Sequence, residues 1–468
     1  MPSLKRWSLV SGLWSLVFVL LSLVPGPWSS TSHASEFFFN PSIAVSEEYN
    51  DNVFETNDRR SDYITRLLPG IALRYSAPFW DWDLAYNYDY RIYAQRSREN
   101  DDAHNLATRG LLKLIDDFLL LDISDTYRKV SLNIARDRTQ ESLFLNQTDS
   151  NTLAASPYIQ FHPVPQTTVR SGYRYTNVWY QDPTAIDRRQ HGGYIDTTYE
   201  LSPGLNLSAN YTYTHENSIN PFDRHAPYAG FRYDYKDRSL LFVYAGYTWL
   251  NSKDGGVDNY PFWNAGITHA FNTWSVFLRT GVLYPEDPRS GVTRETDYSL
   301  GVNKDLNRGT VGASLYYANY KGTNVGLINN IPGSERDISN KYGAGITAKY
   351  ELTTKLTGNL AGSIERYDHR TTNSYIRRIH VNPSLIYALP RDFAVALNYV
   401  FVDSYSPVTE ADRYQANRVS LELRKTFGKM PEGPRPWDGD RGPGTMDPRP
   451  VTSDQRSVTG DRRVADSN

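Results

Sequence analysis

Acidic residues stand beside histidines at two places in the chain. Asp101 and Asp102 shortly precede His104, and Asp368 directly precedes His369. A carboxylate next to an imidazole can orient the ring as a general base, which is an arrangement that hydrolases use. The chain contains neither a G-x-S-x-G nor an H-E-x-x-H motif. Segments rich in Asp, Arg and Asn produce such neighbours by chance, so we expect no enzyme, and a hydrolase is the least favoured alternative.

A second chemistry to weigh is metal binding. His215 and His225 flank one predicted loop, and their ring nitrogens are potential ligands. The two histidines are ten positions apart in the chain, and nothing in this spacing holds the two rings together. The sequence therefore predicts no metal site and no cofactor.

The elements that carry these side chains alternate between two kinds of residue. In Leu205–His215 the odd positions begin Leu, Leu, Ala, Tyr and Tyr, whereas the even positions are Asn, Ser, Asn, Thr and Thr. Successive side chains of a strand point to opposite faces, so this pattern places one face in lipid and the other in water. The alternation recurs from about residue 40 to Phe427. It predicts an all-β fold, a transmembrane antiparallel up-and-down barrel.

The composition favours the same fold class. The chain has 35 Tyr, 10 Trp and 18 Phe, yet only 39% of its 468 residues are hydrophobic and the mean hydropathy is -0.57. A helical membrane protein needs several runs of about 20 apolar residues, and one such run exists. Composition alone leaves a soluble propeller or sandwich as the alternative. The net charge of -2 gives no reason to expect nucleic acid as a partner.

The apolar run predicts a signal peptide over residues 1–34. Lys5 and Arg6 precede the apolar stretch Trp7–Val24, and Ser32-His33-Ala34 offers a small-x-small cleavage site. The mature chain is then expected to begin at Ser35; a retained anchor is the alternative. Cysteine is absent, which is typical of an envelope protein held together by strand pairing without disulfides.

Short polar connections alternate with longer ones along residues 35–427, which is typical of outer-membrane barrels with tight periplasmic turns and long extracellular loops. This rhythm divides the segment into twenty strands. The number is even, so both ends of the barrel are expected on the periplasmic side. If 226–235 and 104–118 are not separate strands, the count is eighteen. The predicted strands are 40–50, 61–76, 81–95, 104–115, 118–132, 149–161, 167–181, 188–201, 205–216, 226–235, 239–251, 259–270, 273–285, 292–304, 309–321, 337–351, 355–369, 375–389, 392–403 and 413–427.

The alternation assigns a face to each strand residue. Trp82, Tyr86, Trp274, Val282 and Tyr284 are expected to face lipid, with aromatic residues near strand ends forming interfacial girdles. Charged residues at the other positions are expected to line the lumen, where most of them pair across strands and fill the wall. These lumen-facing candidates are Asp83, Asp89, Arg91, Arg170, Arg174, Arg279, Lys349, Glu365, Arg366, Arg378, Glu422 and Arg424.

A barrel of about twenty strands encloses more space than its wall side chains can fill. Loops are then expected to narrow the passage, and the longest predicted loops are Asn133–Thr148 and Gly322–Arg336. We expect a channel whose selectivity depends on inward charges and folded-in loops.

The last predicted strand ends in alternating apolar residues and an aromatic one: Leu421, Leu423 and Phe427. This ending resembles the C-terminal signal of outer-membrane proteins that the barrel-assembly machinery inserts. Residues 428–468 follow, rich in Pro, Gly, Asp and Arg, a composition that cannot bury a core. They are expected to form a disordered periplasmic tail, either inert or able to dock a partner.

The start of the predicted mature chain carries three short motifs in order. Ser46 and Tyr49 lead into Asp51-Asn52-Val53-Phe54, which is followed by Ser61–Thr65 (SDYIT) and Pro69-Gly70-Ile71. This order resembles the β-barrel porin family found with capsular and exopolysaccharide loci, including exosortase-type loci. The resemblance implies an outer-membrane barrel linked to polysaccharide export. It implies no residue-level role, because members of the family are mostly uncharacterised.

The sequence therefore predicts a water-filled outer-membrane channel for hydrophilic solutes, with polysaccharide export as a more specific form. The alternative is a closed scaffolding barrel whose tail docks envelope machinery. The expected partners are outer-membrane lipid and lipopolysaccharide, the barrel-assembly machinery and polysaccharide-export proteins.

Overall fold

The chain folds into one sheet of twenty strands. The computed structural model describes residues 35–132, 147–219, 221–253, 257–284, 288, 293–322, 338–369, 374–408 and 410–428. A short 3-10 helix, η2 (Glu410–Asp412), precedes the last strand. The strands are β1 (Glu36–Asn50), β2 (Asp62–Ala77), β3 (Trp80–Tyr93), β4 (Asp101–Ile115), β5 (Leu119–Ser131), β6 (Gln147–Phe161), β7 (Thr167–Tyr180), β8 (Arg188–Ser202), β9 (Leu205–Asn217), β10 (Phe222–Lys236), β11 (Ser239–Ser252), β12 (Val257–Ala270), β13 (Trp274–Leu283), β14 (Thr293–Leu306), β15 (Gly309–Gly322), β16 (Ile338–Glu351), β17 (Leu356–His369), β18 (Tyr375–Leu389), β19 (Phe393–Tyr405) and β20 (Tyr414–Thr426).

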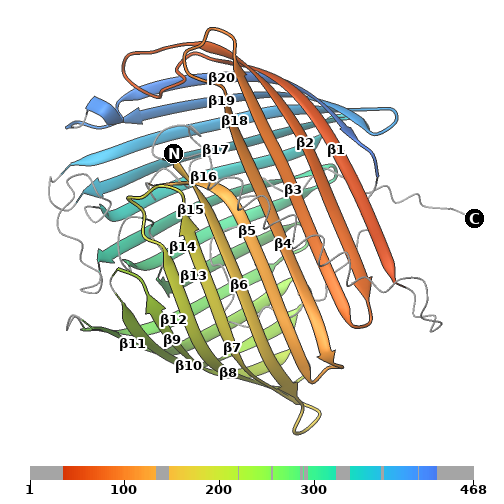
Figure 1. The fold of residues 1–468 in the computed structure, drawn as a ribbon, viewed down its shortest axis with the longest axis vertical. Coiled ribbons are helices and arrows are strands. Elements are labelled where there is room, and N and C mark those ends of the chain that lie inside the picture. The colour runs from red at the N-terminus through yellow and green to blue at the C-terminus, as the bar shows by residue number, and fades with distance from the viewer. Residues whose placement is uncertain are drawn as a thin grey trace, which may run out of the picture.

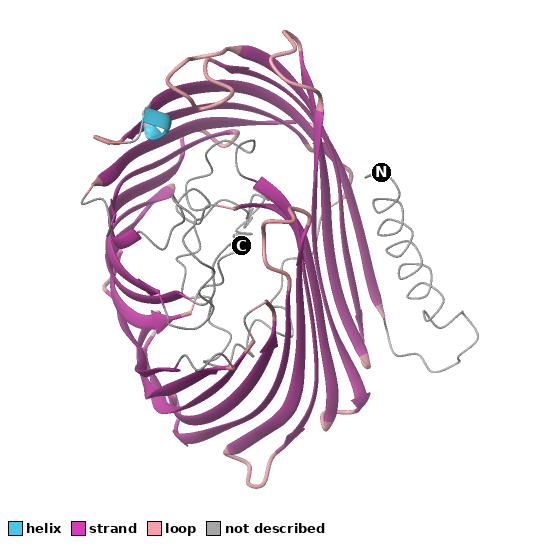
Figure 2. Cartoon of the chain, turned by 60° about the vertical axis from the view of Figure 1, so that its left-hand side comes forward, coloured by secondary structure: helices cyan, strands magenta, loops and turns pink. Residues whose placement is uncertain are grey.

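The sheet is closed. Each strand pairs antiparallel with the next in the chain, and β1 pairs with β20 from Ser42↔Thr426 to Asn50↔Arg418. Figure 1 shows β1 and β20 side by side, and Figure 2 shows the strands as one continuous wall. Closure leaves no strand edge with unpaired backbone groups, as a bilayer requires of a spanning sheet. The predicted count of twenty strands is confirmed, and the count of eighteen is wrong.

The two ends of the barrel differ, as the sequence predicted. At one end, here the turn end, consecutive strands are joined by two to five residues; Gly204 adopts a φ of 82° in the turn between β8 and β9. At the other end, the loop end, most connections are longer, for example residues 51–61 between β1 and β2, and the shortest are 218–221 and 253–256. The barrel begins with β1 and finishes with β20 at the turn end. Residues 1–34 and 429–468, with the predicted signal peptide and almost all of the predicted tail, lie outside the described residues.

One face of the sheet is apolar and exposed. On β13, Trp274, Val276 and Leu278 are 45%, 37% and 51% exposed, and β20 presents Val419, Leu421 and Leu423 in the same way. A barrel stable in a membrane turns its apolar face to lipid, so this is the outward face and the alternate residues point inward. No helix within the described ranges is long and apolar enough to cross a bilayer.

Candidate functional site: the inner wall

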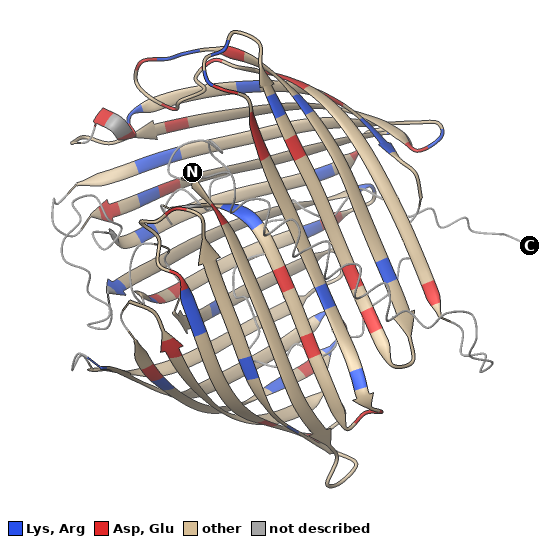
Figure 3. Ribbon diagram, in the orientation of Figure 1, with Lys and Arg blue, Asp and Glu red and all other residues tan. Residues whose placement is uncertain are grey.

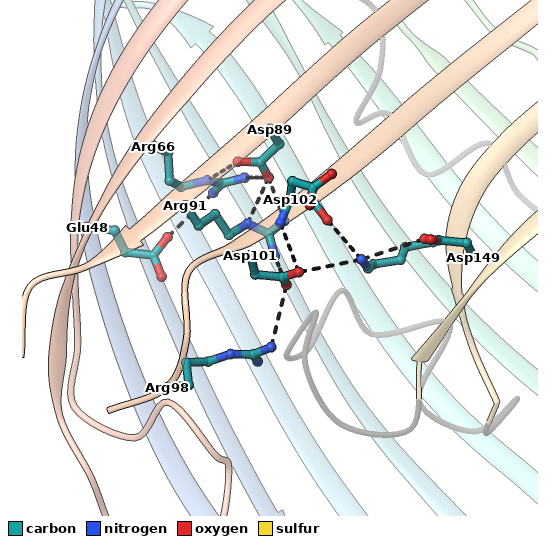
Figure 4. A network of polar contacts seen from close by, with 9 residues as sticks. Glu48, Arg66, Asp89, Arg91, Arg98, Asp101, Asp102 and Asp149 are labelled. Carbon is teal, nitrogen blue, oxygen red and sulfur yellow. Dashed lines mark hydrogen bonds and ion pairs between the residues drawn. The ribbon is translucent and has the colours of Figure 1, made fainter. Parts of the chain in front are cut away.

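Ion pairs cover the inner wall where the chain begins. Near the loop end, the Arg66 guanidinium lies 2.7 Å from Asp89 and 3.5 Å from Glu48. Asp89 also binds Arg91, which is 2% exposed and lies 3.9 Å from Asp101. Figure 4 shows these side chains converging at the loop end of β2–β4.

The same network continues along the rim to β5 and β6. Asp101 lies 3.6 Å from Arg98 and 3.7 Å from Lys129, and Lys129 lies 3.6 Å from Asp149. Four carboxylates (Glu48, Asp89, Asp101 and Asp149) thus meet four cations (Arg66, Arg91, Arg98 and Lys129), so each of these charges has a partner of opposite sign. Charges removed from water are retained when they are paired in this way.

Further inward pairs follow toward the turn end. They are Arg74–Asp83 at 3.0 Å, Arg109–Asp122 at 2.6 Å and Arg424–Glu422 at 2.8 Å. They lie on β2–β5 and β20, so the ladder occupies a continuous arc of the wall, here named the charged arc (β20 and β1–β5). Figure 3 shows acidic and basic residues interleaved along these strands.

A second buried cluster lies on β15–β18. Lys341 is 1% exposed, and its Nζ lies 2.8 Å from Glu365 Oε1. The hydroxyls of Tyr316 and Tyr367 both donate to the Glu365 carboxylate. Arg378, 2% exposed, lies with its Cζ 5.5 Å from the centre of the Tyr367 ring. Three partners thus hold one buried carboxylate, which offsets the free-energy cost of its burial.

Aromatic rings facing glycines occupy another arc of the wall. In each pair an inward Tyr or Phe is the direct cross-strand partner of a glycine: Tyr158 and Tyr194 with Gly172, Tyr228 with Gly246, Tyr244 with Gly230, Phe242 with Gly266, Phe277 with Gly301 and Tyr316 with Gly343. A methyl group on Gly266 would meet the Phe242 ring at 2.7 Å, so these rings cover their glycines. We name β6–β16 the aromatic arc.

The loop after β13 turns inward at the loop end. Tyr284 packs against Phe222 and Leu250, which point inward from β10 and β11. Beyond it, the carbonyl of Pro288 accepts a hydrogen bond of 2.7 Å from the amide of Ile186, in the connection between β7 and β8. Pro288 of the connection between β13 and β14 therefore contacts the connection between β7 and β8, which lies five strands away.

This arrangement corrects two predictions. Val282 and Tyr284 were expected to face lipid, but Val282 is 1% exposed and Tyr284 lies on the inward side. The physical reason is that β12 and β13 pair only as far as Asn264↔Gly281 toward the loop end, which frees the chain beyond to bend inward. The predicted constrictions Asn133–Thr148 and Gly322–Arg336 lie outside the described residues, except at their ends within β6 and β15.

The structure places eleven of the twelve lumen candidates on the inward face. Arg170 donates to Gln160 Oε1, Arg174 lies over the Tyr194 ring and Arg279 lies over the Phe277 ring. The other inward candidates are Asp83, Asp89, Arg91, Lys349, Glu365, Arg378, Glu422 and Arg424. These residues lie on many strands and form several clusters instead of one site.

Arg366 is the exception, and its predicted position is wrong. It follows Glu365 directly, and adjacent residues of a strand point to opposite faces. Arg366 therefore shares the outward face with Ile364, its side chain is 54% exposed, and it binds Asp368 at 2.7 Å.

The two acid–histidine candidates differ in geometry. Asp102 and His104 share the outward face of β4, with Asp102 Oδ2 3.0 Å from His104 Nε2 and Tyr86 Oη 2.7 Å from His104 Nδ1. Asp368 and His369 are adjacent residues on opposite faces, and Asp368 binds Arg366. Asp368 is therefore not placed to orient His369 as a general base.

The histidines weighed for metal binding have separate partners. His215 Nδ1 lies 2.8 Å from Asp223, and His225 Nδ1 lies 2.8 Å from the Tyr211 hydroxyl. Within the described part of the chain, no three His, Cys, Asp or Glu side chains gather as metal ligands.

The residues of the predicted assembly signal lie at the turn end of β20 and just beyond it. Leu421 and Leu423 are 56% and 47% exposed on the outward face, and Phe427 is 61% exposed. The amide of Phe427 donates to the carbonyl of Pro41, so the signal lies at the seam where the barrel closes.

The glycines that face aromatic rings are the main feature that the sequence reasoning missed. The alternation already places these glycines and aromatic residues at inward positions of their strands, so the sequence indicates the face on which they lie. Pairing a given ring with a given glycine, however, requires the register between strands, which the sequence does not state.

No family model and no curated protein matches this chain. Among solved structures, OprD of Pseudomonas aeruginosa aligns with a TM-score of 0.38 and 10% identity, covering 84% of this chain and 96% of that one. OpdO of the same organism gives 0.40 and 10%, covering 84% and 98%. The FrpB iron transporter of Neisseria meningitidis gives 0.48 and 9%, covering 83% and 82%. Similarities this low carry no argument about what the chain does.

Proposed function

We propose that this chain is a channel of the bacterial outer membrane through which hydrophilic solutes diffuse. The observation that carries the proposal is the contrast between the two faces of one closed sheet. The outward face is apolar and suits lipid, whereas the inward face bears paired charges and half-buried tyrosines that suit water. A solid protein core would instead place apolar side chains inside.

The orientation follows from the two ends of the barrel. The turn end, where β1 begins and β20 finishes, is the periplasmic end, and the loop end is extracellular. Outer-membrane lipid and lipopolysaccharide surround the outward face. The barrel-assembly machinery inserts the chain by its last strand, which leads into Phe427.

Liposome swelling tests the proposal. Proteoliposomes containing the purified full chain are diluted into isotonic arabinose, and swelling is followed by light scattering. Swelling that slows as the sugar becomes larger is expected of a diffusion channel. Liposomes that remain as tight as protein-free ones would contradict the channel and favour the closed scaffold.

A more specific form of the function is outward passage of a polysaccharide. Its support is the resemblance of Ser46–Ile71 to barrels found with exopolysaccharide loci. The expected result of deleting the gene is polysaccharide retained in the periplasm while synthesis continues. Unchanged secretion would overturn this form and leave the general channel standing.

The closed scaffold makes a separate prediction about the tail. If residues 428–468 dock envelope machinery, removing them abolishes that association while the barrel still inserts. Solute passage that is unchanged by the truncation, with no lost partner, contradicts the scaffold.

A further inference from the structure

One row of inward side chains on the aromatic arc carries several polar and aromatic groups side by side. Direct cross-strand pairs connect Arg170 to Asp196, Asp196 to Asn210, Asn210 to Tyr228, Tyr228 to Gly246 and Gly246 to Phe262. Gln160 extends the row on β6, because it is the partner of Arg170. We name these residues the polar–aromatic row: Gln160, Arg170, Asp196, Asn210, Tyr228, Gly246 and Phe262.

Gly246 brings the two rings of the row together. A methyl group at this position would come within 2.6 Å of Tyr228 Cβ, so glycine alone leaves room for the tyrosine. The Tyr228 and Phe262 ring centres are then 5.3 Å apart, with the planes inclined at 40°. Both residues are half-buried, so part of each ring remains open to the interior. The row thus ends in a two-ring apolar platform.

The polar half of the row leaves two buried atoms without a partner. Within the described residues, Tyr228 Oη and Asp196 Oδ1 are buried and make no hydrogen bond. Buried polar atoms of this kind are uncommon, and the described residues supply neither atom with a partner. Arg170 is engaged by Gln160 at 2.7 Å and faces Asp196, so the one cation of the row lies opposite its one carboxylate; the nearby Arg174 lies over the Tyr194 ring.

A ligand that suits this row has two kinds of surface. It needs an apolar C–H face for the Tyr228 and Phe262 rings and hydroxyl groups for Asp196, Asn210 and Gln160. A pyranose ring has both, and an uncharged sugar is favoured over an acidic one because the row's one cation already faces a carboxylate. We propose that the polar–aromatic row is a binding site for neutral saccharides inside the channel, which rests on the proposed function.

Blocking of ionic current by maltohexaose tests the proposal. The purified full chain is inserted in a planar bilayer, and maltohexaose is added while the current is recorded. The expected result is a concentration-dependent block that polyethylene glycol of similar mass does not reproduce. Asp196→Asn, which keeps the side-chain shape, is expected to raise the half-blocking concentration about tenfold or more, because a hydrogen bond to a charged group is lost.

The matched control is Asp122→Asn on the charged arc. It removes the same inward charge from the pair with Arg109 and is expected to leave the block unchanged. Tyr228→Leu removes one ring of the platform and is expected to raise the half-blocking concentration of maltohexaose. Tyr228→Phe keeps the ring without the hydroxyl and is expected to be blocked at a lower concentration than Tyr228→Leu. An open channel that maltohexaose never blocks, or blocks equally in Asp196→Asn, overturns the saccharide site and leaves the channel intact.

A barrel that conducts no current contradicts the proposed function, and the saccharide site is then tested by a direct binding measurement. Calorimetric titration of the detergent-solubilised barrel with maltohexaose then gives the answer. Heat of binding that Asp196→Asn abolishes and Asp122→Asn preserves supports the site. Absence of binding heat in the wild type overturns it.

Discussion

At the scale of single residues, glycine determines where the inner wall can hold an aromatic ring. The inward face of a closed sheet is concave, so side chains crowd there more than on the outward face. Tyr228 fits because its partner Gly246 has no side chain, whereas a methyl group there would meet the Pro227 carbonyl as well as Tyr228. Each ring that faces a glycine in the aromatic arc thus depends on one residue of a neighbouring strand.

Gly246→Ala is therefore expected to destabilise the barrel by about 1–3 kcal/mol through overpacking. The close atoms include backbone of β10, which cannot move away as a side-chain end can. Urea unfolding from lipid vesicles, followed by tryptophan fluorescence, measures the change.

Gly193→Ala is the matched control, because its added methyl would have nothing within 4 Å. It is expected to be neutral or slightly stabilising, since alanine restricts the unfolded chain. Equal losses in the two variants would show that strand glycines matter for backbone freedom and not for the facing ring.

Buried charges on the wall make a second prediction at this scale. Glu365→Gln leaves Lys341, which is 1% exposed, without its carboxylate. Breaking a buried pair on one side costs about 3–5 kcal/mol, and access of water to the interior should lower that figure. We expect a loss of about 2–4 kcal/mol in the same unfolding assay.

Glu422→Gln breaks a comparable inward pair at an exposed position, since the Arg424 side chain is 52% exposed. A loss of at most about 1 kcal/mol is expected there, because water solvates the remaining cation. If Glu422→Gln proves as costly as Glu365→Gln, burial is not what distinguishes the two pairs.

At the scale of strands, the sequence was most informative within the apolar belt. The rhythm of short and long connections predicted the number of strands. The alternation predicted the faces of residues such as Trp274 and Leu421, because lipid on one side and water on the other impose a period of two. The prediction missed the outer parts of several strands. The strand expected at 226–235 is β10, Phe222–Lys236, and the loop expected at 217–225 shortens to 218–221.

The missed parts have a common physical cause. At the loop ends the strands extend past the apolar belt, and polar residues such as Asp223 and His215 occupy the outward positions too. Once both faces are polar, the period of two disappears although backbone pairing continues. The inward bend after β13 was unpredictable for another reason: it depends on packing against Phe222 and Leu250, which are distant in sequence.

The assignment of the two barrel ends is testable by accessibility. An epitope tag inserted between Asn217 and Phe222, at the loop end, is expected to bind antibody on intact cells. The same tag inserted between Asp237 and Arg238, at the turn end, should bind only after the outer membrane is permeabilised. The reverse pattern would invert the barrel and contradict the proposed orientation.

At the scale of the whole molecule, the inner wall has two contrasting arcs. The charged arc carries a ladder of ion pairs from Arg66–Asp89 to Arg424–Glu422, whereas the aromatic arc carries rings over glycines and the polar–aromatic row. The sequence predicted eleven of the charged positions but not their division into arcs. The two arcs depend on which side chains meet across neighbouring strands, and the sequence does not state that register.

The closed wall is proposed to surround a water-filled passage, and single-channel recording tests this proposal most directly. The purified full chain in a planar bilayer is predicted to give discrete, stable current steps that rise linearly with salt concentration. Substituting Asp122 and Asp83 by Asn is predicted to shift the reversal potential in a salt gradient, because inward charges then change ion selectivity. Bilayers that contain inserted barrel and show no current steps would contradict the account.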